Sequence, residues 1–180
     1  MQLRSRFGVG CDWPITYADL ESYYGLCEQL IGVAGPAEQG ARWRSTPFPL
    51  PPHPLSPAAK RLQAAGARLG MDWQANSRAA LSMPYDGRPA CNYCGNCSRG
   101  CPVGDKGSAD VTFIRKAEQT GRLALRSDSR LLRLHPAAGG RIASIEYVKG
   151  KTTYRVETPV LVLAAGAIQT PRLLLANRSR

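Results

Sequence analysis

Apolar residues recur at helical spacing between residues 17 and 31. They share one face of the predicted helix: Leu20, Tyr23, Tyr24, Cys27 and Leu30. Thr16 and Asp19 have the spacing of a capping box, with Asp in place of the usual Glu or Gln. Because glycine readily adopts the left-handed backbone of a helix end, Gly32 or Gly35 is expected to end this helix.

Two further helices are indicated by their first residues. Ser56 followed by Pro57 is typical of a helix start, and the apolar spacing continues to Gly70. Ser108 predicts the start of a third helix, which ends at Gly121. Both starts place a hydroxyl where it can accept a hydrogen bond from the first turn.

Proline and glycine interrupt the helical pattern in two places. Residues 46–57 contain six prolines, so this segment is extended and forms neither a helix nor a central strand. We expect it to be a surface connection laid over a larger body, and a proline motif for a protein partner is the alternative. Residues 84–107 are rich in Gly, Pro, Cys and Asn and are predicted to form a loop.

The pattern changes to short strands after residue 121. The predicted strands are Leu123–Arg126, Arg130–Leu134, Arg141–Lys149, Thr152–Glu157 and Val160–Ala164. Gly150 marks a hairpin, whereas Val160–Ala164 is apolar on both faces, as a central parallel strand is. A helix beginning at Thr170-Pro171 follows. This order predicts a mixed α/β (α+β) fold, with an antiparallel meander in part of a nucleotide-binding domain.

Composition narrows the class of protein. The chain has 180 residues, the length of one domain or of a piece of a larger protein. Apolar residues make up 43% and charged residues 21%, which excludes wholesale disorder. No run reaches the roughly 18–20 apolar residues that span a bilayer. Residues 1–11 contain no apolar signal segment, and the sequence assigns no compartment.

The net charge of +11 is unevenly distributed. Residues 1–57 carry −1, residues 58–133 carry +7 and residues 134–180 carry +5. A basic face for nucleic acid is one interpretation. Because the cations are scattered singly and aromatic residues make up only 7%, we expect no nucleic-acid partner. A solvated surface, or a face toward an anionic cofactor, accounts for the charge equally well.

The strongest chemical signal is a run of cysteines with the spacing C-x2-C-x2-C-x3-C-P. Its four cysteines are candidate metal ligands: Cys91, Cys94, Cys97 and Cys101. Bacterial ferredoxins use this spacing because one loop of soft thiolates can surround an iron–sulfur cluster. Three thiolates would suit a 3Fe–4S cluster, and a fourth ligand would suit a 4Fe–4S cluster. Zinc, disulfides and a metal-free loop remain alternatives, although zinc knuckles usually have separated cysteine pairs.

Three segments resemble the glucose–methanol–choline (GMC) family of flavin oxidoreductases. Residues 12–24, beginning Asp-Trp-Pro-Ile-Thr-Tyr, resemble a segment that precedes the family's substrate domain. Residues 94–112 resemble the cysteine-bearing bacterial branch with sugar and gluconate dehydrogenases. Residues 166–175, Gly-Ala-Ile-Gln-Thr-Pro-Arg-Leu-Leu-Leu, resemble the second family signature. The resemblance implies a substrate-domain or connecting segment over 1–83, a cysteine loop over 84–107 and part of a Rossmann-like FAD domain over 108–180.

The same resemblance implies where FAD contacts the chain. Its adenine would lie against the backbone at Leu131, and its flavin near residues 164–166. The implied cofactor-binding residues are Leu131, Ala164, Ala165, Gly166, Thr170 and Pro171. In some sugar dehydrogenases of this family a 3Fe–4S cluster is bound with a C-x5-C-x3-C-P spacing, which Cys91, Cys97 and Cys101 match.

The resemblance implies oxidation of an alcohol or sugar CH–OH group, with hydride transfer to flavin N5 and electron transfer to a cytochrome or quinone. The family's G-x-G-x-x-G turn and catalytic histidine have no counterpart, since His53 and His135 are expected at the surface. The chain is therefore expected to be an inactive middle piece of the enzyme. A ferredoxin-like electron carrier or metal-binding module without flavin is the alternative from another class.

Overall fold

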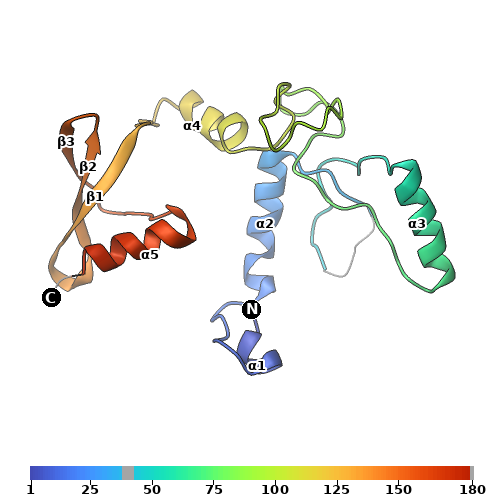
Figure 1. The fold of residues 1–180 in the computed structure, drawn as a ribbon, viewed down its shortest axis with the longest axis horizontal. Coiled ribbons are helices and arrows are strands. Elements are labelled where there is room, and N and C mark those ends of the chain that lie inside the picture. Colours follow the sequence, from blue (N-terminus) through green and yellow to red (C-terminus); the bar gives the residue numbers. More distant parts are fainter. Residues whose placement is uncertain (38–42, 179–180) are drawn as a thin grey trace. The chain divides into compact units, whose positions relative to one another are not determined.

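The computed structural model describes residues 1–37 and 43–178, and the chain divides into two compact units, Met1–Leu123 and Ala124–Arg180. The first contains α1 (Leu3–Phe7), α2 (Tyr17–Ile31), α3 (Pro57–Arg68), a π-helical turn (Asp110–Ile114) and α4 (Arg115–Gln119). The second contains β1 (Ser129–Pro136), a 3₁₀ turn (Ala138–Gly140), β2 (Ile142–Lys149), β3 (Thr152–Glu157) and α5 (Gly166–Ala176) (Figure 1). The predicted mixed α/β class is confirmed.

The two long helices of the first unit begin as predicted. At α2, the Thr16 N–H donates to Asp19 Oδ2 at 2.7 Å, and this hydrogen bond holds the pKa of Asp19 below its ordinary value. At α3, the Ala59 N–H donates to Ser56 Oγ at 3.1 Å. Gly32 ends α2 with a left-handed φ of 81° and donates its N–H to the Glu28 carbonyl at 2.9 Å.

Most of the proline-rich segment is exposed or half-buried, but its predicted surface position is wrong for two of its residues. Leu50 is buried and forms one core cluster with Ala34 and Leu81. His53 is only 7% exposed. The reason is backbone pairing across the sequence, because Ala34 bridges to Leu50 on one side and to Arg78 on the other.

The second unit is built on an antiparallel sheet with the strand order β1–β2–β3 among the described residues. Lys149 pairs with Thr152, which confirms the predicted hairpin. Leu134 and Tyr147 are buried on the sheet, and Leu173 is buried on α5. The Leu134 N–H donates to Asn177 Oδ1 at 2.9 Å, so the residue after α5 is attached to β1.

Two predicted strands do not form. Val160–Ala164 is irregular, and Val160 and Val162 are 74% and 80% exposed. Leu123–Arg126 also has no strand structure. An apolar run becomes a strand only when a second strand supplies its hydrogen bonds, and the described sheet pairs with neither segment.

Two helix starts also differ from prediction. The third helix opens as a π-helical turn, in which the Ile114 N–H reaches the Ala109 carbonyl at 2.9 Å. The last helix begins at Gly166 and not at Thr170, because the Thr170 hydroxyl accepts the Ala165 N–H at 3.1 Å and so holds the earlier turn.

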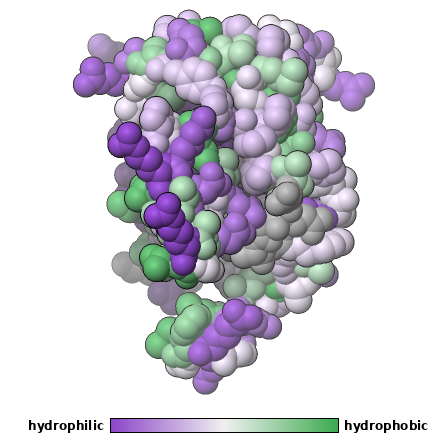
Figure 2. Space-filling model, turned by 90° about the vertical axis from the view of Figure 1, so that its right-hand side faces the viewer, coloured by the Kyte–Doolittle hydropathy of each residue, from purple (hydrophilic) through white to green (hydrophobic). Residues whose placement is uncertain are grey.

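Hydrophobic and hydrophilic residues are mixed on the face shown in Figure 2, where green patches are scattered among purple ones. No helix in residues 1–37 or 43–178 combines the length and apolar character needed to cross a bilayer.

Candidate functional site

The cysteine run lies in a loop that hydrogen bonds to its own backbone and side chains. The Tyr93 N–H donates to Cys91 Sγ at 3.4 Å, and the Cys101 thiol donates to Asp105 Oδ1 at 2.9 Å. Lys106 Nζ donates to the Cys97 carbonyl at 2.7 Å. Cys94 and Cys97 are exposed, whereas Cys91 and Cys101 are half-buried.

These thiols, as they lie, do not fit a metal ion or cluster. No three His, Cys, Asp or Glu side chains converge on a metal position anywhere in residues 1–37 and 43–178. Burial raises the pKa of the Cys91 thiol, and the nearby Asp105 carboxylate raises it further. Metals bind thiolates, so both effects oppose ligation. The iron–sulfur cluster therefore stays a prediction from the sequence.

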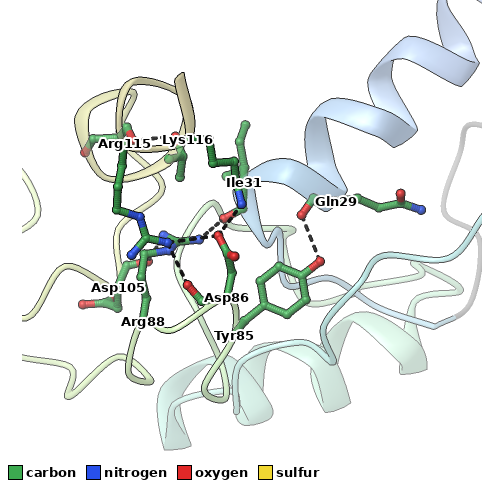
Figure 3. A network of polar contacts seen from close by, with 10 residues as sticks. Gln29, Ile31, Tyr85, Asp86, Arg88, Asp105, Arg115 and Lys116 are labelled. Carbon is green, nitrogen blue, oxygen red and sulfur yellow. Dashed lines mark hydrogen bonds and ion pairs between the residues drawn. The ribbon is translucent and has the colours of Figure 1, made fainter. Parts of the chain in front are cut away.

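A polar network fixes the base of this loop to α2 and α4, as Figure 3 shows. The Tyr85 hydroxyl donates to the Gln29 carbonyl at 3.0 Å. Arg88 is buried, and its guanidinium donates to the carbonyls of Ile31 and Asp105. Because carbonyl oxygens only accept, these contacts fix the guanidinium between the end of α2 and the end of the cysteine loop.

Asp86 adds an ionic contact to the same network. Its carboxylate lies 2.6 Å from Lys116 Nζ and 3.1 Å from Arg115 Nη2, both in α4. The hydrogen bond from Lys116, together with the charges of Lys116, Arg115 and Arg88, holds the pKa of Asp86 below its ordinary value of 3.8. The folded state thus favours the ionised carboxylate.

We expect Asp86→Asn to lower the free energy of unfolding by about 1 kcal/mol at neutral pH, since two partly exposed ion pairs are lost. Asn tolerates the left-handed φ of 51° at this position, so the backbone should not add strain. Wild-type stability from this group is present above a pH of 3.8 and is lost as pH falls through the lower folded pKa. In urea unfolding, the difference in free energy of unfolding between the wild type and Asp86→Asn should therefore shrink in acid. A difference that stays constant at every pH would contradict this account.

The sequence did not reveal that buried His53 and exposed Tyr93 form a pair. Tyr93 Oη lies 3.0 Å from His53 Nδ1, and the Ala80 carbonyl lies 2.9 Å from His53 Nε2. The two rings meet edge to face with centroids 5.6 Å apart. In the sequence, this pair is a histidine among prolines and a tyrosine among cysteines, 40 residues apart. Nothing in either local pattern indicates that the two side chains meet. His135, also expected at the surface, is half-buried beside Glu146.

The predicted cofactor residues occupy two places in the second unit. Residues 164–166 and Thr170 lie at the start of α5, and Pro171 lies inside that helix. Leu131 lies in β1, opposite Tyr147. The assignment of both groups to FAD stays a prediction.

The start of α5 fits an anionic or carbonyl-bearing group. Gly166 has a φ of 86°, and a Cβ built on it would meet no atom within 4 Å. Ala164, Ala165 and Gly166 are exposed. The first N–H groups of a helix have no partner within the helix and carry its partial positive charge. A ligand oxygen can therefore approach the backbone here without obstruction.

Comparison with known proteins places the chain among flavin-family enzymes. The family model described as GMC oxidoreductase matches residues 50–178. The 6'''-hydroxyparomomycin C oxidase of Streptomyces lividus is 37% identical over 175 residues, covering 96% of this chain and 32% of that protein. The fructose dehydrogenase large subunit of Gluconobacter japonicus is 33% identical over 178 residues, covering 97% of this chain and 32% of that protein.

A third relative is the paromamine 6'-oxidase of Streptomyces fradiae, which is 34% identical over 175 residues, covering 95% of this chain and 31% of that protein. The chain thus spans about a third of the length of these curated relatives. The matched family segment includes the cysteine loop, the three-stranded sheet and α5. On this similarity, the chain belongs to the GMC oxidoreductases.

Proposed function

We propose that this chain is part of an FAD-dependent enzyme that oxidises a CH–OH group of a sugar or other small alcohol. The GMC oxidoreductases bind FAD, and relatives of this chain are named as a 6'''-hydroxyparomomycin C oxidase, a fructose dehydrogenase large subunit and a paromamine 6'-oxidase. The observation that carries the proposal is the exposed turn at residues 164–166, which opens α5 inside the matched segment.

In this proposal the start of α5 holds the cofactor. The N–H groups of its first turn would donate to oxygen atoms of FAD, and Gly166 would leave room for that approach. Thr170 keeps the turn in place through its bond to the Ala165 N–H. Bound FAD would supply a two-electron acceptor for hydride from the substrate carbon. A cytochrome or quinone is the proposed final acceptor.

The proposed reaction assigns no chemical role to the cysteine loop. Its thiols, as they lie, form no ligand set, and a ferredoxin-like carrier would depend on one. The family match over residues 50–178 also favours a flavoenzyme over an independent electron carrier.

The proposal is tested by anaerobic addition of sugars and simple alcohols to the native FAD-loaded protein that contains these residues. Bleaching of the flavin absorbance by at least one sugar or alcohol, followed by reoxidation with a quinone or ferricyanide, is the expected result. A flavin that no such compound reduces would overturn the proposal.

We expect Gly166→Ala to weaken FAD binding by about tenfold, equivalent to about 1.4 kcal/mol. The added Cβ occupies the approach to the helix start and strains a left-handed backbone. The matched control is Gly150→Ala in the β2–β3 turn, where φ is 60° and a Cβ also meets nothing within 4 Å. Both substitutions carry the same kind of strain, so equal loss of FAD in a fluorescence titration would contradict the assignment.

A further inference from the structure

A hollow of about 410 Å³ lies beside α3 in the first unit. This volume falls in the range of about 300–1,000 Å³ typical of small-molecule sites. Its lining comes from three segments, residues 53–63, residues 73–78 and Tyr93 of the cysteine loop. Arg78 is the only formally charged side chain among the lining residues, so the hollow is suited to a neutral or singly anionic ligand.

The hydrogen bonds of buried His53 determine which atoms in one wall of the hollow donate and which accept. The Ala80 carbonyl can only accept, so His53 Nε2 donates to it, and in the tautomer with its proton on Nε2 the ring presents Nδ1 as an acceptor. The Tyr93 hydroxyl therefore donates to Nδ1, and its own oxygen can still accept a hydrogen bond from a ligand. Tyr93 has a left-handed φ of 57°, a strained conformation for a bulky residue that is often found at functional sites.

Trp73 forms an aromatic wall of the hollow, and its indole packs against Gly66 of α3. A Cβ added to Gly66 would lie 2.5 Å from Trp73 Cδ1, so the glycine leaves a slot for the indole. Gln63 Nε2 also donates to the Trp73 carbonyl at 2.7 Å, which attaches this residue to the helix. The indole is still 47% exposed, so it can contact a ligand.

The remaining polar groups of the lining are neutral hydrogen-bonding side chains. They are Ser56, Gln63, Gln74 and Asn76. An amide offers both donors and an acceptor, which suits hydroxyl groups that also donate and accept. An indole face packs against the C–H groups of a ring and leaves the ring's hydroxyls at its edge for such partners.

We propose that this hollow binds the ring of a carbohydrate, with the ring stacked on Trp73 and its hydroxyls bonded to Tyr93 Oη and the amide side chains. The inference rests on the proposed function, because it names sugars as the substrate class within the alcohols considered there. It also gives the cysteine loop a role, which is to hold Tyr93 against His53.

The test is titration of the 180-residue chain with glucose, fructose and cyclohexanol, followed by nuclear magnetic resonance of the Trp73 indole and the His53 ring. We expect saturable shifts with a sugar at millimolar dissociation constants, and binding of cyclohexanol about tenfold weaker because it has one hydroxyl. A folded chain that shows the His53–Tyr93 contact but no saturable shift with either sugar would overturn the proposal.

Substitutions of lining residues test whether the sugar binds in this hollow. Trp73→Ala should weaken sugar binding at least about tenfold and Asn76→Ala about threefold, whereas Trp13→Ala, which lies outside the lining, should leave it unchanged. Asn76 is exposed, so its substitution tests the hollow even if Trp73→Ala unfolds the unit. Unchanged sugar affinity in Asn76→Ala and Trp73→Ala would contradict the proposed site.

This titration involves neither flavin nor turnover, so it fails independently of the proposed function. Sugar binding that depends on Trp73, combined with a native enzyme that oxidises no sugar or alcohol, would contradict the proposed function alone. Sugar oxidation by the native enzyme with an unchanged KM in Trp73→Ala and Asn76→Ala would contradict the carbohydrate site alone.

Discussion

Leu81→Ala is expected to lower the free energy of unfolding of the first unit by about 3 kcal/mol, because it removes methyl groups from a fully packed position. Leu81 is 0% exposed and forms the core cluster with Ala34 and Leu50, against which Tyr85 packs. The surrounding side chains are expected to close only part of the cavity left behind. Urea unfolding of the wild type and the variant measures the difference.

The control for this prediction is Leu69→Ala, because Leu69 is 73% exposed at the end of α3. Its truncation should change stability by less than about 0.5 kcal/mol, as surface substitutions usually do. Similar losses for the two variants would mean that Leu81 is not part of a packed core.

The Leu81 core also supports both parts of the candidate site in the first unit. The Leu81 carbonyl accepts the Cys91 N–H at 2.8 Å, and the neighbouring Ala80 carbonyl lies 2.9 Å from His53 Nε2. One short segment therefore holds the start of the cysteine loop and the histidine beneath Tyr93. Loss of the core is expected to release both.

The elements that sequence predicted well are those determined by neighbouring residues. The capping box of Thr16 and Asp19, the cap at Ser56 and the left-handed end at Gly32 all act within four residues along the chain. Such contacts form wherever the residues occur, so their spacing was enough to place α2 and α3. The β2–β3 hairpin was predicted for the same reason.

Elements that depend on distant partners were predicted poorly. Val160–Ala164 has the composition of a buried strand, but none of the described strands pairs with it. Leu50 and His53 lie in a proline run that suggested the surface, yet both are buried, and Leu50 pairs with Ala34. The composition of a segment indicates which structures it can form, whereas its burial depends on which other segment packs against it.

The candidate site shows the same distinction. The cysteine spacing suggested a metal, but burial and Asp105 disfavour the thiolate form of Cys91. The hollow beside α3 depends on His53 meeting Tyr93 and on Trp73 meeting Gly66, and neither contact has a short-range pattern. The resemblance identified the family because it depends on ordered motifs and not on these contacts.

Gly32→Ala is the second substitution with a large expected effect, a loss of about 3 kcal/mol in the free energy of unfolding of the first unit. Its left-handed φ of 81° strains any residue with a Cβ. The new Cβ would also lie 2.6 Å from Leu81 Cδ2 and 2.9 Å from Tyr85 Cδ1. The chain would therefore have to move the side chains that form its core.

Gly70→Ala separates these two causes. Gly70 follows α3 with a φ of 71°, but a Cβ there would meet nothing within 4 Å. Its substitution should cost about 1 kcal/mol from backbone strain alone. If urea unfolding gives equal losses for the two glycines, the predicted collision with Leu81 is wrong.

Combining Gly32→Ala with Leu81→Ala tests the collision directly. Removing the Leu81 side chain eliminates the atom nearest the new Cβ, so the double variant should be more stable than the sum of the two losses predicts. We expect a coupling of about 1 kcal/mol, a magnitude ordinary for residues in contact. Strict additivity would show that the end of α2 does not pack on the core that supports the cysteine loop.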